Sequence, residues 1–292
     1  MLAARRLALG TAQLGQSYGI ANRSGQPDLR EAGDIVRSAR LAGMDTIDTA
    51  VAYGSSESVL GTVGVGDLRI VTKLPALPPE DVDIGAWTRT QVSESLQRLG
   101  VARLEALLLH RPGDALESRG AGLLTALHAL QADGLVAKLG VSIYDPAELE
   151  RLAQVMDLGL VQAPYNILDR RLLASGWLAR LRGQGVEIHA RSAFLQGLLL
   201  LDEARLPPAF ARWRPVLDRW WAWLREHQLQ PLQAALGFVL RTDAIDRVIV
   251  GVESAAQLRE ITSGAAALER DVPLELACND IDLIDPSKWK RN

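Results

Sequence analysis

The fold of this chain is decided by RIVTKL (69–74), TRTQVSESLQRLG (88–100) and LEALLLH (104–110). The two flanking runs are short and largely apolar, which is typical of strands that are covered on both faces in a parallel sheet. The middle stretch places its apolar residues on one helical stripe and stops at Gly100. A strand, a helix and another strand in this order predict a right-handed βαβ unit.

The same alternation continues along all 292 residues, so that eight β-rich runs are separated by longer stretches with helical spacing. Eight βα units in a chain of this length are typical of a (β/α)8 TIM barrel. We therefore predict an α/β fold with one domain over residues 1–292. A doubly wound open sheet is the alternative, although no G-x-G-x-x-G motif follows the first run. The six further runs are LALG (7–10), MDTIDTA (44–50), AKLGVSI (137–143), LVQAPYN (160–166), VEIHARS (186–192) and DRVIVGV (246–252).

Capping signals mark several helix ends. Asp28, with Glu31 three residues later, predicts a capping box, and Ala42-Gly43 predicts the end of that helix. Asp145 and Ser254 predict N-caps of helices over the stretches that follow them.

The segment 202–245 is longer than one helix needs and is rich in tryptophan. Trp213, Trp220 and Trp223 fall on about one helical face, with Trp221 beside them. This pattern favours packing against the barrel wall, and a lid that faces the substrate is the alternative.

The composition excludes several classes of protein. A net charge of -3 and the lack of a long basic run argue against nucleic acid or an anionic membrane as a partner. No apolar run approaches the roughly 20 residues that span a bilayer, and MLAARRLALGTA (1–12) lacks the apolar core of a signal peptide. The single cysteine, Cys278, excludes an internal disulfide and favours an inert thiol in a cytoplasmic protein. The histidines show no ligand spacing, so we expect no metal.

Four side chains that can carry proton chemistry follow neighbouring strands of the predicted barrel. Asp48 ends the second run, Tyr53 lies in the loop after it, and Lys73 and His110 end the third and fourth runs. The C-terminal ends of barrel strands gather at one rim, so we expect the four to converge there. Taken singly, each residue has a purely structural explanation. The aspartate could cap a turn, the phenol could be packed in the core, the lysine could be a solvated strand end and the histidine could be a core residue. Four of them at one rim favour a catalytic site.

The four side chains complement one another chemically. The ordinary pKa of a phenol is near 10, so we predict that Lys73 lowers the pKa of Tyr53 and that Asp48 holds Lys73 charged. A neutral His110 can donate a hydrogen bond to a carbonyl oxygen. This set suits carbonyl reduction, and a nicotinamide has to supply the hydride because side chains cannot.

With this tetrad the chain resembles the aldo-keto reductases, from LALGTAQLG (7–15) to GVESAAQLREI (251–261). It is most similar to bacterial members that keep GTAQLGQSYGIANRSG and RSAFLQGLLL at these places. The resemblance implies a nicotinamide dinucleotide, NADP or NAD, that is bound without a Rossmann fold. It implies Tyr53 as the general acid in reduction, with Lys73 and Asp48 tuning it and His110 orienting the substrate carbonyl.

The resemblance also implies a set of cofactor contacts. Ser142 and Gln162 match positions that bind the carboxamide, whereas Ile143 stands where many relatives have asparagine. Arg191 replaces an aromatic ring that stacks on the nicotinamide; its planar guanidinium can stack as well, and a salt-bridged strand end is the alternative. The implied cofactor-binding residues are Gly10, Thr11, Ala12, Asp48, Ser142, Gln162, Arg191, Ser192, Phe194, Gly197, Gly251, Glu253, Gln257 and Glu260.

Glu253 departs from the pattern of NADPH-using relatives, which often place a basic or small polar residue there, near the 2′-phosphate. A carboxylate repels a phosphate but accepts hydrogen bonds from an unphosphorylated ribose. We therefore hypothesise a weakened NADP preference, with use of NAD or of both cofactors. The alternative is that Glu253 turns to solvent while Arg259 meets the phosphate.

The substrate is a small-molecule carbonyl or alcohol in this interpretation, contacted by Tyr18, Tyr53 and His110. The loop QLGQSYGIANRSGQ (13–26) is polar and includes Arg23, which favours a hydroxylated or sugar-like substrate. Two other functions stay open. One is a Schiff-base lyase with Lys73 as nucleophile, and the other is a non-catalytic barrel that senses redox state by binding cofactor and docks a partner. We expect a monomer or small homo-oligomer.

Overall fold

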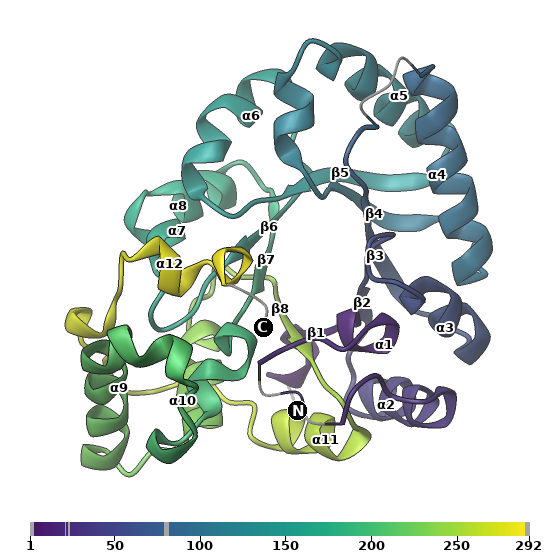
Figure 1. Cartoon of the computed structure of the whole chain (residues 1–292). Helices are drawn as coiled ribbons and strands as arrows, with labels where there is room; N and C mark the ends of the chain where they lie inside the picture. The colour runs from purple at the N-terminus through teal and green to yellow at the C-terminus, as the bar shows by residue number, and fades with distance from the viewer. Residues whose placement is uncertain (1–2, 21, 23, 79–81, 290–292) are drawn as a thin grey trace.

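The computed structural model describes residues 3–20, 22, 24–78 and 82–289. Eight strands, all paired in parallel, close into a barrel in the order β1 to β8 (Figure 1). Each predicted run carries one strand, so the predicted (β/α)8 barrel is confirmed. The strands are β1 Leu7–Gly10, β2 Thr46–Asp48, β3 Arg69–Leu74, β4 Leu104–Leu109, β5 Val136–Ser142, β6 Leu160–Pro164, β7 Glu187–Arg191 and β8 Arg247–Gly251.

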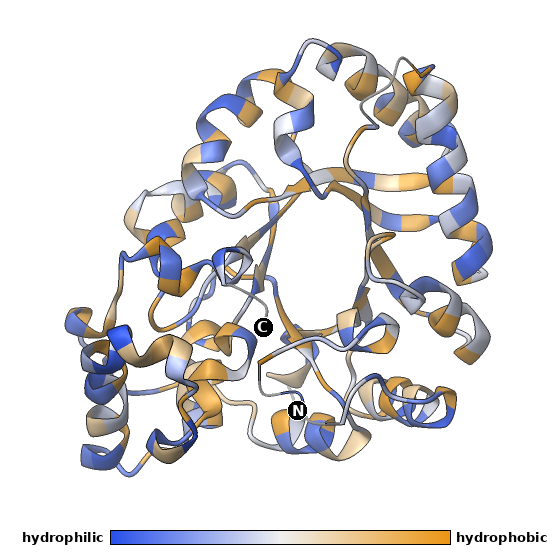
Figure 2. Cartoon of the chain, in the orientation of Figure 1, coloured by the Kyte–Doolittle hydropathy of each residue, from blue (hydrophilic) through white to orange (hydrophobic). Residues whose placement is uncertain are grey.

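Helices surround the barrel and cover its outer face. Figure 2 shows mostly hydrophobic strands inside a ring of helices whose colours alternate between hydrophobic and hydrophilic residues. This is the pattern expected when one stripe of each helix packs on the sheet and the other faces water. The helices are α1 Ala12–Gly15, α2 Leu29–Leu41, α3 Ser56–Val63, α4 Ile84–Leu99, α5 Gly120–Ala132, α6 Leu149–Val155, α7 Arg171–Ala174, α8 Trp177–Gly183, α9 Arg214–Glu226, α10 Pro231–Leu240, α11 Ala255–Ser263 and α12 Ile281–Ile284.

The capping predictions are confirmed with one exception. The Asp28 side chain accepts a hydrogen bond from the Glu31 N–H, as expected. The second hydrogen bond of the predicted capping box, from the Asp28 N–H to the Glu31 side chain, is wrong. The Glu31 carboxylate instead accepts from the Ala255 N–H at 2.6 Å and so holds the start of α11. Ser254 caps α11 as predicted, and Asp145 makes a complete capping box with Glu148.

The α4 helix begins earlier than the sequence stripe suggested. It starts at Ile84, and the Asp83 side chain caps it by accepting from the Ala86 N–H. It ends as predicted, at Gly100, which adopts the left-handed conformation with φ 66°.

The inside of the barrel is narrow and apolar at mid-height. Val71, Ala106, Leu108 and Leu160 form a separate buried cluster there. Gly140 faces this cluster, and a Cβ at Gly140 would overlap the carbonyl oxygen of Leu160. Glycine is therefore required at this point because only a residue without a side chain lets the strands approach.

Below this cluster, a charged network fills the end of the barrel where the strands begin. Arg69 contacts the Glu105 carboxylate at 2.9 Å, and Lys138 contacts Glu187 at 2.6 Å. The His189 ring is fully buried and its Nε2 lies 2.9 Å from a Glu187 oxygen. These charges satisfy one another at the end of the barrel opposite the predicted site.

The four tryptophans of the long segment are all buried, which confirms the core interpretation. The indole N–H of Trp220 donates to the Leu199 carbonyl at 3.2 Å, and that of Trp221 donates to the Leu201 carbonyl at 2.9 Å. The tryptophans thereby fix the loop that follows β7.

Two further observations concern the chain as a whole. No helix in the described part is both long and apolar enough to cross a bilayer. Cys278 is buried, and burial raises the pKa of its thiol, which keeps it in the unreactive protonated form and agrees with the predicted inert thiol.

Candidate active site

A buried ion pair lies at the rim of the barrel. Lys73, the fifth residue of β3, extends its ammonium to both carboxylate oxygens of Asp48, each at 2.8 Å, and to the Thr49 carbonyl at 2.9 Å. Burial lowers the pKa of Lys73, while the Asp48 charge opposes this effect. The ammonium is fully buried and all its partners belong to β2 and the turn after it. Lys73 is therefore a fixed charge beneath the site.

Gln162 extends this network across the barrel from β6. Its amide N–H donates to Asp48 Oδ1 at 2.6 Å, and its carbonyl oxygen accepts from the Ser142 hydroxyl at 3.1 Å. Both side chains are buried. The sequence suggested a cofactor role for this pair; the structure adds that Gln162 orients Asp48.

Tyr53 and His110 lie above the ion pair. The two rings meet edge to face with centroids 5.8 Å apart, and Lys73 Nζ lies 5.0 Å from the Tyr53 ring centroid. Burial and the neighbouring Lys73 lower the pKa of His110 to about 4. The imidazole is therefore neutral at physiological pH, as predicted, and can donate one hydrogen bond.

The predicted acidification of the phenol is wrong in this structure. Burial raises the pKa of Tyr53 above its ordinary value, and the Asp48 carboxylate adds to the rise, while Arg191 opposes it. Lys73 does not reverse this because its charge is already neutralised by Asp48. The phenol is consequently protonated at neutral pH, which is the form that a proton donor needs.

A cleft of about 1560 Å³ opens above these groups and runs across the C-terminal ends of the strands. Tyr53, His110 and Asp48 line it, whereas Lys73 lies beneath its floor. Every predicted cofactor-binding residue lines this same cleft: Gly10, Thr11, Ala12, Asp48, Ser142, Gln162, Arg191, Ser192, Phe194, Gly197, Gly251, Glu253, Gln257 and Glu260.

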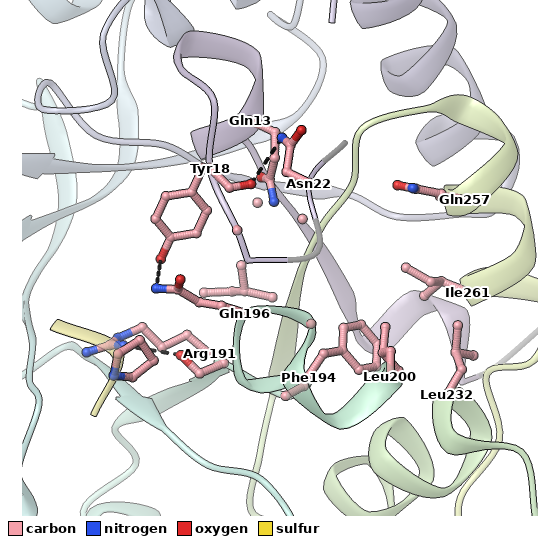
Figure 3. Close-up of a pocket in the computed structure, with 18 of the residues that line it drawn as sticks. Gln13, Tyr18, Asn22, Arg191, Phe194, Gln196, Leu200, Leu232, Gln257 and Ile261 are labelled. Atoms are coloured by element: carbon pink, nitrogen blue, oxygen red, sulfur yellow. Dashed lines mark hydrogen bonds between the residues drawn. The ribbon is translucent and has the colours of Figure 1, made fainter. Parts of the chain in front are cut away.

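Two loops from non-adjacent strands meet over the cleft. The Gln196 amide donates to the Tyr18 hydroxyl at 3.0 Å, and the Ile20 N–H donates to the Gln196 carbonyl at 3.2 Å. Figure 3 shows Tyr18 and Gln196 pointing toward each other. Tyr18 lines the cleft as predicted, and Arg23 lies outside the described residues.

The loop after β7 has an unusual backbone. Ser192, Leu195 and Gln196 adopt positive φ values of 60°, 48° and 52°, and Gly197 follows at 94°. Such conformations are strained for residues with side chains and are typical of functional sites. The loop is held on one side by the tryptophans and on the other by Tyr18.

Arg191 is not the salt-bridged strand end considered as an alternative. Its Nη2 donates to the Ile143 carbonyl at 2.8 Å, and its guanidinium lies 4.2 Å from the centroid of the Tyr144 ring. Within the described residues it forms no ion pair.

The α11 end of the cleft is acidic and polar. Glu253, Gln257 and Glu260 line it, and the Gln257 side chain accepts from the Glu253 N–H at 2.8 Å. Arg259 is directed elsewhere, since its guanidinium contacts the Ser38 hydroxyl at 3.4 Å.

Thr11 has a structural role that sequence reasoning missed. Its hydroxyl donates to the Asp48 carbonyl at 2.9 Å and accepts from the Ser56 hydroxyl at 2.9 Å, so its side chain braces the β2 turn. Sequence reasoning also missed several residues that line the cleft, because the fold brings them from distant segments: Tyr144, Gln196, Leu200, Arg225, Leu232, Ile261 and Trp289. Among the described residues, no group of three or more His, Cys, Asp or Glu is arranged to hold a metal ion.

A sequence profile described as the Aldo/keto reductase family matches residues 6–271. The chain belongs to this family. It is thus an NAD(P)H-dependent aldo-keto reductase, an oxidoreductase built on a TIM barrel.

Relatives of this aldo-keto reductase cover most of its length. The NADH-specific methylglyoxal reductase of Escherichia coli (strain K12) is 24% identical over 87% of this chain and 88% of its own. The D-threo-aldose 1-dehydrogenase of a Pseudomonas species is 27% identical over 89% and 91%. The aldo-keto reductase AKR11C1 from Bacillus halodurans, in its holo form, shares the fold with a TM-score of 0.71 at 21% identity, over 91% of this chain and 88% of that one.

Proposed function

We propose that this enzyme reduces a hydroxylated or sugar-like aldehyde or ketone to an alcohol, with Tyr53 as the general acid. One observation carries the proposal: a protonated phenol and a neutral imidazole line the same cleft above the buried Lys73–Asp48 pair. Both groups can hydrogen bond to one carbonyl oxygen, and only the phenol has an acidic proton to give up.

The cleft suits a nicotinamide dinucleotide. Its volume of about 1560 Å³ exceeds the 300–1,000 Å³ typical of sites for drug-sized ligands. It joins the catalytic groups to the α11 end, where Leu200, Leu232 and Ile261 add apolar surface beside the polar residues and suit the flat face of an adenine (Figure 3). When bound, the dinucleotide supplies the hydride that the side chains cannot supply.

Tyr53 holds the proton that the reaction consumes. Its raised pKa keeps the hydroxyl protonated at neutral pH. As negative charge develops on the substrate oxygen, the proton passes from the Tyr53 hydroxyl to that oxygen and leaves a phenolate. Arg191 then stabilises the phenolate electrostatically, since its charge acts to lower the pKa of Tyr53.

His110 orients the carbonyl. With its pKa lowered to about 4, the ring stays neutral and donates one hydrogen bond without acting as a competing acid. Its edge-to-face contact with Tyr53 sets the angle between the two donors.

The cofactor preference is the second part of the proposal, and we infer that the enzyme uses NADH better than NADPH. Glu253 and Glu260 line the α11 end of the cleft, and the residues that α11 adds to the lining, within the described part, include no Lys or Arg. Arg259 contacts Ser38 instead. The NADH-specific name of one relative supports this preference.

The polar wall of the cleft supports a hydroxylated substrate. Gln13, Gln16, Tyr18 and Asn22 line it, and they offer both donors and acceptors. A relative named for D-threo-aldose supports a sugar-like carbonyl. The buried, ion-paired Lys73 argues against the Schiff-base alternative, since a nucleophile has to reach the cleft.

The test is a panel of carbonyl compounds assayed by the absorbance of the reduced nicotinamide, with NADH and NADPH in parallel. We expect kcat/KM to be highest with hydroxylated aldehydes and at least about 10-fold higher with NADH. Activity confined to apolar aromatic aldehydes contradicts the substrate class, and a strong NADPH preference contradicts the cofactor inference.

A further inference from the structure

Arg191 gives the reacting end of the cleft a positive charge that forms no ion pair with any carboxylate of the described residues. Lys73, the buried cation beneath this end of the cleft, is matched by Asp48, and His110 is neutral because its pKa is about 4. Arg191 lines the cleft together with Tyr53 and His110. Over the described residues its hydrogen-bond partners are a backbone carbonyl and a hydroxyl, both uncharged.

The guanidinium is held in a fixed orientation. It stacks on the Tyr144 ring at 4.2 Å, donates to the Ile143 carbonyl at 2.8 Å and contacts the Ser192 hydroxyl at 3.4 Å. A guanidinium has five N–H donors, so this arrangement orients the group and still leaves donors for a ligand. Figure 3 places Arg191 at the opposite side of the view from Gln257 and Ile261 of α11.

The field of Arg191 reaches the catalytic groups. It acts to lower the pKa of Tyr53, of Lys73 and of His110. A cation that influences all three groups lies close to the place where a substrate carbonyl meets them.

We propose that Arg191, backed by Tyr144, binds a carboxylate of the substrate, so that the preferred substrate is an acidic carbonyl compound such as an aldehyde acid, a 2-oxo acid or a uronate. A carboxylate matches the planar fork of the guanidinium and accepts two parallel hydrogen bonds. The inference rests on the proposed carbonyl reduction and adds an acidic group to its substrate; a uronate is the acid that also belongs to the hydroxylated class.

The experiment compares pairs that differ in one acidic group: glyoxylate with glycolaldehyde, succinic semialdehyde with 4-hydroxybutanal, and D-glucuronate with D-glucose. For the wild-type enzyme, kcat/KM is expected to favour the acid in at least one pair by about 10-fold or more, the gain typical of a charge-assisted contact. Equal or lower values for the acid in all three pairs overturn the proposal.

Two variants then identify the group responsible. Arg191→Gln is expected to reduce kcat/KM for the acid about 10- to 100-fold more than for its neutral partner, and Arg191→Lys is expected to retain part of the selectivity. Loss of the electrostatic effect of Arg191 on Tyr53 lowers kcat/KM equally for the acid and for its neutral partner. A change in the acid-to-neutral ratio therefore reports on binding of the carboxylate alone. An unchanged ratio overturns the proposal.

Arg225→Gln is the matched control, because Arg225 lines the same cleft but pairs with Glu203. Its acid-to-neutral ratio is expected to equal that of the wild type. The Kd of NADH, measured by fluorescence, is expected to stay within about 3-fold in Arg191→Gln. A rise of 10-fold or more assigns the guanidinium to the dinucleotide and overturns the proposal.

Calorimetric titration measures the Kd of D-glucuronate and of D-glucose, and it tests the inference even if the enzyme reduces neither compound. If the wild type reduces no carbonyl, the proposed function fails, whereas tighter binding of D-glucuronate that Arg191→Gln abolishes still supports the carboxylate site. Equal binding of the two sugars in that case overturns it.

Discussion

Gln162 on β6 donates its amide N–H to Asp48 on β2 at 2.6 Å, across the mouth of the barrel. The Asp48 carboxylate, which binds the Lys73 ammonium, is thus fixed in turn by the Gln162 amide from the opposite side of the barrel. The site is built as a chain of contacts beneath the cleft, and each member fixes the next.

Replacing Gln162 with Met tests this chain of contacts. The variant keeps the volume but removes the donor, so Asp48 loses one of its hydrogen bonds and the Lys73–Asp48 pair can shift. We expect kcat to fall about 10- to 100-fold, with a smaller loss in Ser142→Ala, which removes only the partner of the Gln162 carbonyl. Steady-state kinetics with a wild-type kcat in Gln162→Met contradicts a role in positioning Asp48.

The Lys73–Asp48 pair is expected to matter for stability as well as for activity. Lys73→Met leaves the Asp48 carboxylate buried without its cation, which typically costs about 3–5 kcal/mol. The double variant Asp48→Asn with Lys73→Met removes both charges and is expected to recover most of this loss without recovering turnover. Urea unfolding of the three proteins measures the difference, and equal stability of Lys73→Met and the wild type argues against a buried pair.

Gly140 is expected to tolerate no side chain. A methyl group there overlaps the Leu160 carbonyl, so Gly140→Ala is predicted to lower the free energy of unfolding by about 2 kcal/mol or more. Gly183 at the end of α8 is the matched control, because a Cβ there meets nothing within 4 Å and its φ is ordinary. Gly183→Ala is expected to be neutral or stabilising by up to about 1 kcal/mol. Thermal melts that rank the two variants in the reverse order contradict the described packing.

The charged network at the bottom of the barrel predicts a loss of stability in acid. Burial alone would raise the pKa of Glu187, but hydrogen bonds from His189 and Lys138 hold it below its ordinary value. The pKa of Glu105 is lowered by Arg69 and Lys138 in the same way, against the effect of burial. A carboxyl whose pKa is lower in the folded chain contributes stability above its unfolded pKa, about 4.3, and loses it as pH falls below that value.

We therefore expect the Tm to decline as the pH falls below about 5, and we expect Glu187→Gln to lower Tm at pH 7 and to flatten this decline. Melting curves between pH 3 and 8 for both proteins provide the measurement. A decline of the same steepness in Glu187→Gln shows that other groups control the acid transition.

Much of the fold follows from local patterns in the sequence. The strands are apolar because both of their faces are covered, and this makes each run stand out from the helical stretches between. The start of α4 was not evident because Ile84 to Trp87 lie before the clear stripe, and only Asp83 marks the cap. The Glu31 carboxylate accepts a hydrogen bond from a backbone N–H at a helix start, as predicted, but the donor is Ala255 of α11.

The candidate site likewise has residues that local sequence patterns predict and residues that only the folded barrel brings together. The tetrad was predictable because each member stands at the end of a recognisable strand. The protonation of Tyr53 was not, because it depends on burial that only the closed barrel creates. The side walls at Arg225 and Trp289 come from segments far from the tetrad in sequence, and no local pattern connects them with it.

The central claim is that the Tyr53 hydroxyl gives its proton to the substrate oxygen. The most direct test is single-turnover reduction of a carbonyl substrate by Tyr53→Phe, together with the Kd of NADH measured by fluorescence. The structure predicts a rate about 10²- to 10⁴-fold below that of the wild type, with NADH affinity within about 3-fold and an unchanged Tm. A variant that retains more than about a tenth of the wild-type rate contradicts the account.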